Sequence, residues 1–273
     1  FYTENNGIGG WIFYETIIEN IQLPQNATLI GPSVFAYSSL KSITIPNGVT
    51  SIGGNAFVGC ASLVNVTIPD GVTEIPASAF SSCTSLTSIN IPNSVTEIAF
   101  RAFNGCSSLS SVIIGNGVTS IGDNAFEDCS SLASINLPDA LTSIGSAAFH
   151  NCSSLASIYI PDAVATIGNG AFYGCTILKS VEFSSESSLT LIDELTFREC
   201  SSLISISIPD AVAEIASSAF YECSSLVSAI VGSGVTSIGD NAFYHCSSLE
   251  SLNLPDALTS IGRNAFTSSS KLE

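Results

Sequence analysis

The sequence predicts a β-rich solenoid of about eleven coils with little helix, and three recurring columns of residues carry this prediction. Cysteine stands at positions 60, 83, 106, 129, 152, 175, 200, 223 and 246, so every interval is 23 residues except one of 25. Phenylalanine and leucine keep the same interval, beginning at positions 57 and 63. One unit reads C-S-S-L-x-S-I-x-I-P-D-x-V-x-x-I-G-x-x-A-F-x-x-C. Such a period is typical of proteins built from stacked repeats.

The first element of each unit is predicted to be a strand. Apolar residues alternate with small polar residues at its end, as Ile135 and Leu137 do, and a period of two marks a half-buried strand. A proline such as Pro138 then follows, and it ends the strand because it has no backbone donor. We expect each strand to pair in parallel with the strand of the next coil, about 4.8 Å away.

The second element of each unit is a short apolar pair followed by a turn. Val118 and Ile121 form the pair in one unit, and Gly122 comes next. We expect Gly122 to turn the backbone in a conformation that is closed to other residues. Ala125 and Phe126 then return the chain to the core. Helix is expected to be scarce, because no segment sustains a 3.6-residue period for three turns.

Charge and hydropathy exclude several classes of protein. The 273 residues contain 6 Lys and Arg against 23 Asp and Glu, a net charge of −17. A chain so poor in cations cannot neutralise a phosphate backbone or an anionic membrane surface, which argues against nucleic acid and acidic lipid as partners. Hydrophobic residues make up 45% of the chain, enough for a folded core. There is no run of 18 apolar residues, so no membrane insertion is expected.

The cysteine column is interpreted as a buried stack of reduced thiols. Nine is an odd number, so complete pairing within the chain is impossible. Neighbouring coils would place the Cα atoms within disulfide range, yet stacked side chains point in parallel and disfavour the required dihedral. Isolated disulfides between neighbours remain an alternative. A line of thiols without a C-x-x-C motif does not suit the four converging ligands of a structural zinc site.

The remaining chemistry-bearing residues predict no enzyme and no cofactor. His150 and His245 each lie close before a cysteine, but no unit supplies the orienting third group that a Cys-His nucleophile needs. Aspartates such as Asp210 and Asp256 follow the strand-closing proline, where a short polar side chain can hydrogen-bond the backbone of the turn. Calcium binding along that edge is a weaker alternative, because asparagine interrupts the column.

The repeat resembles a known family. The unit from Cys129 through Ile144 and Gly145 to Phe149 is similar to the BspA-type class of leucine-rich repeats, which occurs mostly in surface and secreted proteins of bacteria and some unicellular eukaryotes. The resemblance extends over residues 18–273. It implies a curved right-handed superhelix that binds other macromolecules, often in adhesion, without catalysis. By the same analogy the strand face would be concave.

Positions that differ between units are not required by the scaffold, so they show where the surface can bind a ligand. The position just after the conserved phenylalanine becomes aromatic or basic toward the C-terminus. Such side chains dominate interface hot spots because they bury much area at small entropic cost. His245 follows Tyr244 and adds to the same end. We name the set the aromatic stripe and predict it as the ligand-binding surface, although its rings could instead only shield the outer turns: His150, Tyr173, Arg198, Tyr221, Tyr244 and His245.

The strand face offers a competing site. The side chains between the buried residues are small and mostly uncharged. Such side chains also suit a sheet face that contacts only solvent. The largest and most distinctive side chains there are Ile113, Tyr159, Glu182 and Ile230.

One unit departs from the rule. Between Cys175 and Cys200 the chain gains two residues around Ser184 to Ser188, and Asp193 replaces the usual glycine. We expect a bulging loop that leaves the stacked core intact. The loop is either a tolerated insertion without function or a binding feature beside Arg198.

The domain prediction is an N-terminal cap at residues 1–17 and a solenoid at residues 18–273 that is truncated at its C-terminal end. Trp11, Phe13 and Tyr14 are apolar enough to cover an open coil end. The function predicted is an extracellular or cell-surface recognition or adhesion module that binds a protein or glycan, with a monomer favoured over an oligomer. The alternatives are a structural protein that assembles into fibres or a surface layer, and an intracellular scaffold, since free thiols suit a reducing compartment.

Overall fold

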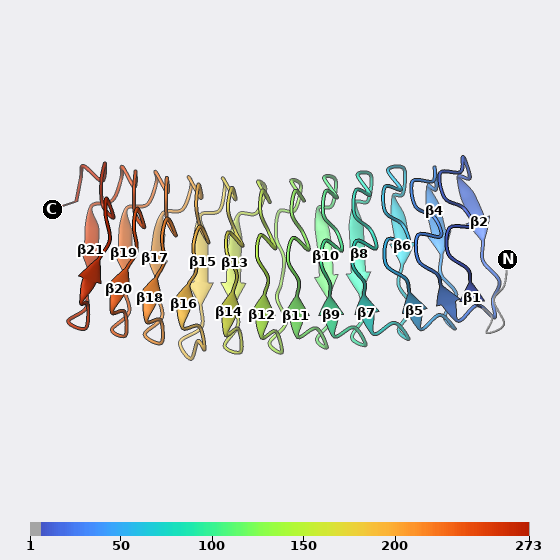
Figure 1. Cartoon of the computed structure of the whole chain (residues 1–273), viewed down its shortest axis with the longest axis horizontal. Coiled ribbons are helices and arrows are strands. Elements are labelled where there is room, and N and C mark those ends of the chain that lie inside the picture. The colour runs from blue at the N-terminus through green and yellow to red at the C-terminus, as the bar shows by residue number, and fades with distance from the viewer. Residues whose placement is uncertain (1–6, 273) are drawn as a thin grey trace.

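The computed structural model describes residues 7–272, which form one rod of stacked coils (Figure 1). Two rows of short parallel strands run the length of the rod. The row of longer strands contains β2 (Asn20–Gln22), β4 (Ser42–Thr44), β6 (Asn65–Thr67), β8 (Ser88–Ile91), β10 (Ser111–Ile114), β13 (Ser157–Ile160), β15 (Ser180–Phe183), β17 (Ser205–Ser207), β19 (Ser228–Ile230) and β21 (Ser251–Asn253). In one further coil the row is kept by a single bridge between Val112 and Ile135.

The second row consists of two-residue strands at the V-x-x-I position of each coil. It contains β1 (Gly7–Ile8), β3 (Leu29–Ile30), β5 (Ser51–Ile52), β7 (Glu74–Ile75), β9 (Glu97–Ile98), β11 (Ser120–Ile121), β12 (Ser143–Ile144), β14 (Thr166–Ile167), β16 (Leu191–Ile192), β18 (Glu214–Ile215), β20 (Ser237–Ile238) and β22 (Ser260–Ile261). All pairings are parallel and join equivalent residues of neighbouring coils, such as Ile121 with Ile144. The described residues contain no helix. The predicted solenoid of about eleven coils is therefore confirmed.

Phenylalanine builds the centre of the core. Rings from Phe13 to Phe266 stack one on the next, with centroids 5.0–5.5 Å apart. Leucine, isoleucine and valine of the two strand rows pack around this stack and are buried. The Phe column includes Phe13, and β1 pairs with β3. Residues 7–17, the described part of the predicted cap, thus share the register of the coils that follow.

The cysteines are all free and buried, as the buried-stack interpretation predicts. Each thiol lies 3.0–3.2 Å from the backbone carbonyl oxygen of the phenylalanine in the preceding coil and donates to it. Cys129 donates to Phe103 O in this way. Ser269 replaces cysteine in the last coil, and its hydroxyl donates to Phe243 O over 3.1 Å. The column therefore links successive coils as well as filling space.

The expected role of the turn glycine is wrong. Gly122 does not have a positive φ. It lies instead where two coils approach so closely that a Cβ would stand 2.9 Å from the backbone of Ala99 and Phe100. The left-handed residues occupy two other columns, represented by Asn124 (φ 57°) and Asp128 (φ 58°).

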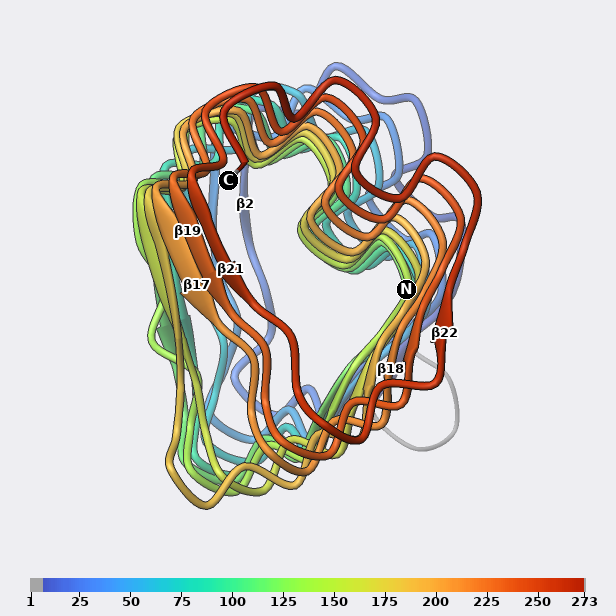
Figure 2. The ribbon, with the colours of Figure 1, turned by 90° about the vertical axis from the view of Figure 1, so that its left-hand side faces the viewer.

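The expectation of a concave strand face is also wrong. Viewed along the rod, the middle coils are displaced from the coils at both ends, toward the side that carries the longer strands (Figure 2). The longer strands therefore follow the outer side of a gentle bend. The opposite wall consists of strands and tight turns and contains no described helix. A helix is wider than a strand, so a layer of helices would increase the spacing of the coils on that side, and this effect is missing here. No described helix is long and apolar enough to cross a membrane.

Candidate recognition surfaces

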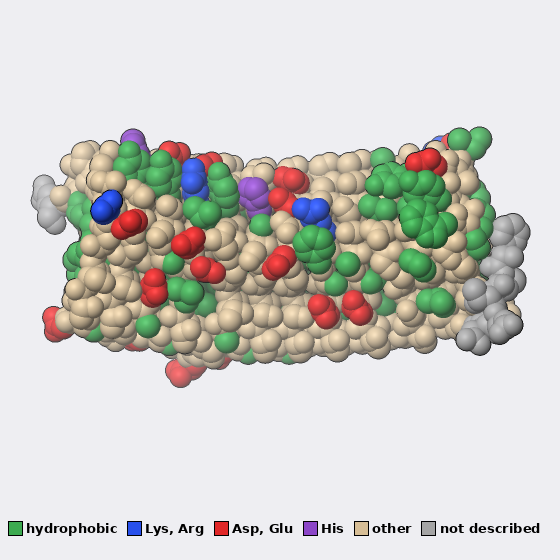
Figure 3. Space-filling model, in the orientation of Figure 1, with side chains coloured by type: hydrophobic (Ala, Val, Ile, Leu, Met, Phe, Trp, Pro, Cys, Tyr) green, Lys and Arg blue, Asp and Glu red, His purple; other side chains and the backbone are tan. Residues whose placement is uncertain are grey.

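The aromatic stripe is a continuous row of side chains at the edge of the rod, all half-buried except the exposed His245. The repeat places one residue after each core phenylalanine, so the coil spacing sets the distance between the rings. His150 stacks on Tyr173 with ring centroids 4.8 Å apart, and Tyr221 stacks on Tyr244 at 4.9 Å. Figure 3 shows hydrophobic, basic and histidine side chains gathered along this upper edge.

Arg198 joins the two aromatic pairs into one file. Its guanidinium carbon lies 5.2 Å from the ring centre of Tyr173 and 4.6 Å from that of Tyr221. Its Nε donates to Glu199 Oε1 over 3.2 Å, and the Tyr173 hydroxyl donates to the same oxygen over 3.1 Å. His245 closes the file with its ring edge-on to Tyr244 at 4.6 Å. The structure thus brings all six predicted residues of the stripe together.

Carboxylates flank the stripe and set its electrostatics. Desolvation, followed by the hydrogen bond to Glu199, raises the pKa of Tyr173, and desolvation with the nearby Glu222 charge raises that of Tyr221. His150 Nδ1 lies 3.1 Å from Glu127 Oε1. Tyr173 and Tyr221 are therefore neutral hydrogen-bonding groups at physiological pH.

The stacking decides which ligands suit the stripe. Each inner ring has its faces covered by the ring or guanidinium on either side, so it offers its edge and polar tip to solvent. A sugar that stacks on aromatic faces finds few free ones. A protein partner can bury the edges and bond the hydroxyl groups, which matches the use of Tyr and Arg at protein interfaces.

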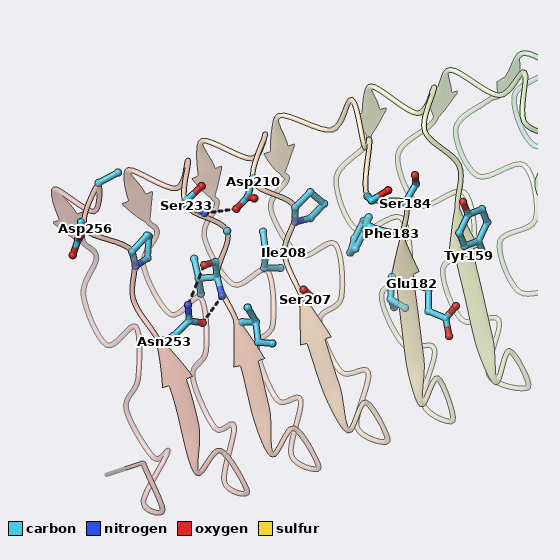
Figure 4. A pocket seen from close by; sticks show the side chains of 18 residues that line it. Tyr159, Glu182, Phe183, Ser184, Ser207, Ile208, Asp210, Ser233, Asn253 and Asp256 are labelled. Carbon is cyan, nitrogen blue, oxygen red and sulfur yellow. Dashed lines mark hydrogen bonds between the residues drawn. The ribbon is translucent and has the colours of Figure 1, made fainter.

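A shallow groove of about 970 Å³ lies on the strand face near the C-terminal end of the rod (Figure 4). We name it the strand-face groove. It is lined by side chains from β13, β15, β17, β19 and β21 and from the turns after them. The groove brings together three of the four competing residues, Tyr159, Glu182 and Ile230. Ile113 is exposed on β10 and does not line it.

The two-residue insertion belongs to this groove. Ser184 and Ser185 form part of its wall, whereas Arg198 lies with Tyr173 and Tyr221 in the stripe. The insertion and Arg198 thus belong to different surfaces, because the extra residues follow the end of a longer strand while Arg198 follows the core phenylalanine. The core absorbs the insertion without a break, since Phe172 and Phe197 still stack at 5.5 Å.

Sequence reasoning did not select one exposed aromatic cluster near the N-terminus as a surface. Trp11 and Tyr14 have ring centroids 5.0 Å apart, and Tyr14 lies 5.8 Å from Tyr37. Trp11 is 62% exposed and Tyr37 is 55% exposed. The aromatic residues around Trp11 are the sequence signal for this cluster, and the same residues predict a cover for the coil end. Within residues 7–272, no group of three His, Cys, Asp or Glu side chains could hold a metal ion.

Comparison with known proteins agrees with this architecture. The model of the BspA type leucine rich repeat region matches in 6 copies, over residues 1–86, 73–203 and 142–273. The chain belongs to the BspA-type leucine-rich repeat family. A leucine-rich repeat protein from Bacteroides ovatus is 35% identical with a TM-score of 0.89, over 98% of this chain and 69% of that one.

Two further solved structures are similar to this BspA-type chain. The leucine-rich repeat protein of T. pallidum is 28% identical with a TM-score of 0.50, and the match covers 80% of this chain and 79% of that protein. A leucine-rich repeat protein from Eubacterium ventriosum shares the fold, at 24% identity and a TM-score of 0.57 over 95% of this chain and 67% of that one. No curated protein matches the chain.

Proposed function

We propose that this protein is a non-catalytic recognition module of the cell surface or extracellular space, and that it docks a protein partner along the aromatic stripe. The observation that carries the proposal is the continuous stack from His150 through Arg198 to Tyr244. The repeat does not need these residues, because Val58, Ser81 and Asn104 occupy the same column in earlier coils. Membership of a family found mostly in surface proteins supports the location.

Rigidity favours the stripe as a docking surface. Its side chains are half-buried, except that of His245, and they are held by one another and by the backbone of consecutive coils. Such groups lose little conformational entropy when a partner covers them, so more of the contact energy appears as affinity. The covered ring faces favour protein over glycan as the partner.

The test compares two variants on immobilised extracellular glycoproteins, each presented with and without its glycans. Tyr221→Ala removes a central ring of the stripe, and Tyr159→Ala removes an exposed ring of the strand face. We expect wild-type binding that survives deglycosylation and that Tyr221→Ala weakens by about 2 kcal/mol, roughly thirtyfold. If Tyr159→Ala alone weakens binding, the strand face is the recognition surface and the stripe shields the outer turns.

Self-assembly is the second candidate function. The aromatic stripe is the observation that favours it, because the partner that buries its ring edges can also be a second copy of the chain. Sedimentation equilibrium separates the two candidates, because assembly predicts a mass that rises with concentration.

A further inference from the structure

We propose that the strand-face groove binds an extended polypeptide segment rich in lysine or arginine, at a site separate from the aromatic stripe. The groove is elongated and open, which suits a chain laid across several coils rather than an enclosed small molecule (Figure 4). This site goes beyond the proposed function, because docking along the stripe does not require it.

The floor of the groove is apolar and partly exposed. Ile230 is 58% exposed and Tyr159 is 49% exposed, and the half-buried Phe183 lies between them along the row of strands. These side chains offer contact area that no neighbouring coil covers. A bound segment with apolar residues, or with the aliphatic stems of lysine and arginine, would bury that area.

The charge of the groove selects the partner. Glu182, Asp210 and Asp256 line it, and no lysine or arginine does. No described residue forms a hydrogen bond or ion pair with the carboxylate of Glu182 or of Asp256. Asp210 accepts a hydrogen bond from the backbone N–H of Ser233 over 2.6 Å, which lowers its pKa and keeps it ionised. A cationic segment would supply the missing counter-charges.

The hydrogen-bonding groups favour a peptide over a glycan. Asn253 Oδ1 accepts from Val231 N over 2.8 Å and its Nδ2 donates to Val231 O, so the amide is already engaged with the backbone. The Ser233 N–H is engaged by Asp210, and Ser184 Oγ accepts from Glu186 N. The free carboxylates, the apolar surface and the hydroxyl groups of Tyr159, Ser185 and Ser207 remain. The carboxylates beside apolar surface fit cations on aliphatic stems better than they fit uncharged sugar hydroxyls.

The coil spacing fits an extended chain. The coil of Asp256 stands three coils beyond that of Glu182, which is about 14 Å along the rod at the usual strand spacing. Asp256 also lies three residues past Asn253, the counterpart of Glu182 in its coil, which adds up to about 10 Å in the strand direction. About five to six residues of an extended peptide span the resulting distance of about 17 Å. A segment of that length can present cations to both carboxylates.

The experiment measures fluorescence anisotropy of the full chain with a labelled peptide of about ten residues in which lysine alternates with valine. A peptide with glutamate at the lysine positions is the charge control. We expect the lysine peptide to bind and the glutamate peptide to bind far more weakly. Affinity should fall between about 50 and about 500 mM NaCl, because salt screens these exposed charges.

Variants locate the site. Glu182→Gln and Asp256→Asn should each weaken the lysine peptide about threefold, and the double variant about tenfold. Asp139→Asn is the matched control, because Asp139 also follows a strand-closing proline but lies outside the groove. Tyr221→Ala should leave peptide binding unchanged, which separates this site from the stripe. Equal binding of both peptides, no binding of the lysine peptide, an equal loss in Asp139→Asn, or binding of neutral oligosaccharides in its place would overturn the proposal.

Discussion

Each phenylalanine of the core column carries a large share of the stability at the scale of single residues. Phe126 is fully buried and stacks between Phe103 and Phe149. Replacement of such a ring by alanine removes buried area and leaves a cavity that a stack of rigid coils cannot close. The exposed Ser134, by contrast, contributes only its own hydration.

We expect Phe126→Ala to lower the free energy of unfolding by about 3–5 kcal/mol. Ser134→Ala should change it by less than about 0.5 kcal/mol. Urea denaturation followed by circular dichroism measures both. Comparable losses in the two variants would contradict the assignment of inner and outer faces.

The thiols make stability sensitive to alkaline pH. Burial raises the pKa of Cys106, Cys175 and Cys246 to about 12 from an ordinary value of 9.0. A thiol whose pKa is raised by folding contributes its full stability below pH 9 and loses it as the pH rises toward 12, because the unfolded chain releases the proton first. Each thiol then costs about 1.4 kcal/mol per pH unit above 9.

We therefore expect cooperative alkaline unfolding that begins above about pH 9. In Cys106→Ser the hydroxyl can donate to Phe80 O as the thiol does now and as Ser269 does to Phe243 O. The free energy of unfolding of this variant should fall less steeply with pH than that of the wild type, by about 1.4 kcal/mol per unit. Urea denaturation at a series of pH values gives the slopes, and identical slopes would show that Cys106 does not titrate on unfolding.

At the scale of the structural element, close approach between coils limits what the turns tolerate. A Cβ at Gly122 would meet backbone atoms of Ala99 and Phe100 at 2.9 Å, and backbone cannot swing aside as a side-chain end can. A Cβ at Gly54 would meet Ala77 O at 3.4 Å, an ordinary contact. The two glycines form a matched pair for this effect.

Gly122→Ala should destabilise the protein by about 1–3 kcal/mol through overpacking. Gly54→Ala should be within about 0.5 kcal/mol of the wild type, since neither residue has a positive φ. Thermal unfolding followed by circular dichroism measures the difference. A larger loss at Gly54 than at Gly122 would mean that spacing between coils is not what requires glycine.

The sequence predicts the elements, because each recurs at a fixed interval, but it does not predict features that depend on three-dimensional spacing between the coils. The 23-residue interval predicts the strand rows and the phenylalanine and cysteine stacks, because equivalent residues must stack in a solenoid. It does not predict the close approach at Gly122, because the interval between residues does not give the distance between the backbones of neighbouring coils. Asn and Gly recur in the left-handed columns, as at Asn124 and Gly59, but the columns also hold Arg101 and Leu195, so residue type alone does not predict them.

The candidate surfaces were predictable to different degrees for the same reason. The stripe follows from one column, and the structure brings its members into contact. The groove was missed as a cavity because its wall comes from the inserted Ser184 and Ser185, whose direction relative to Tyr159 depends on the shape of the coil. Phe183 also lines the groove, although it stands in a column that otherwise holds buried isoleucines such as Ile160. The pattern of apolar residues does not distinguish such a residue from a core residue.

For the whole molecule, charge governs association. The net charge is −17 at neutral pH, and the isoelectric point is near 4.1. Rods of like charge repel one another at neutral pH, and this repulsion vanishes near the isoelectric point.

We expect light scattering to report a monomer at about pH 7.5 over a hundredfold range of concentration, and association as the pH approaches 4.1. Tyr221→Ala removes a central ring of the stripe and serves as the companion variant. Concentration-dependent growth at neutral pH that this variant abolishes would favour assembly through the stripe over a monomeric module.

The thiol bonds all point the same way along the rod, from each coil to the carbonyl of the coil before it. A ribosome makes the coils in that order, so the acceptor of every bond exists before its donor emerges. Each new coil meets a surface of matching rings and carbonyls, and it needs only the coil directly after it to complete bonds such as that from Phe126 N–H to Ala148 O. The protein can thus fold in step with its translation, one short segment at a time, without long-range contacts that wait for the end of the chain.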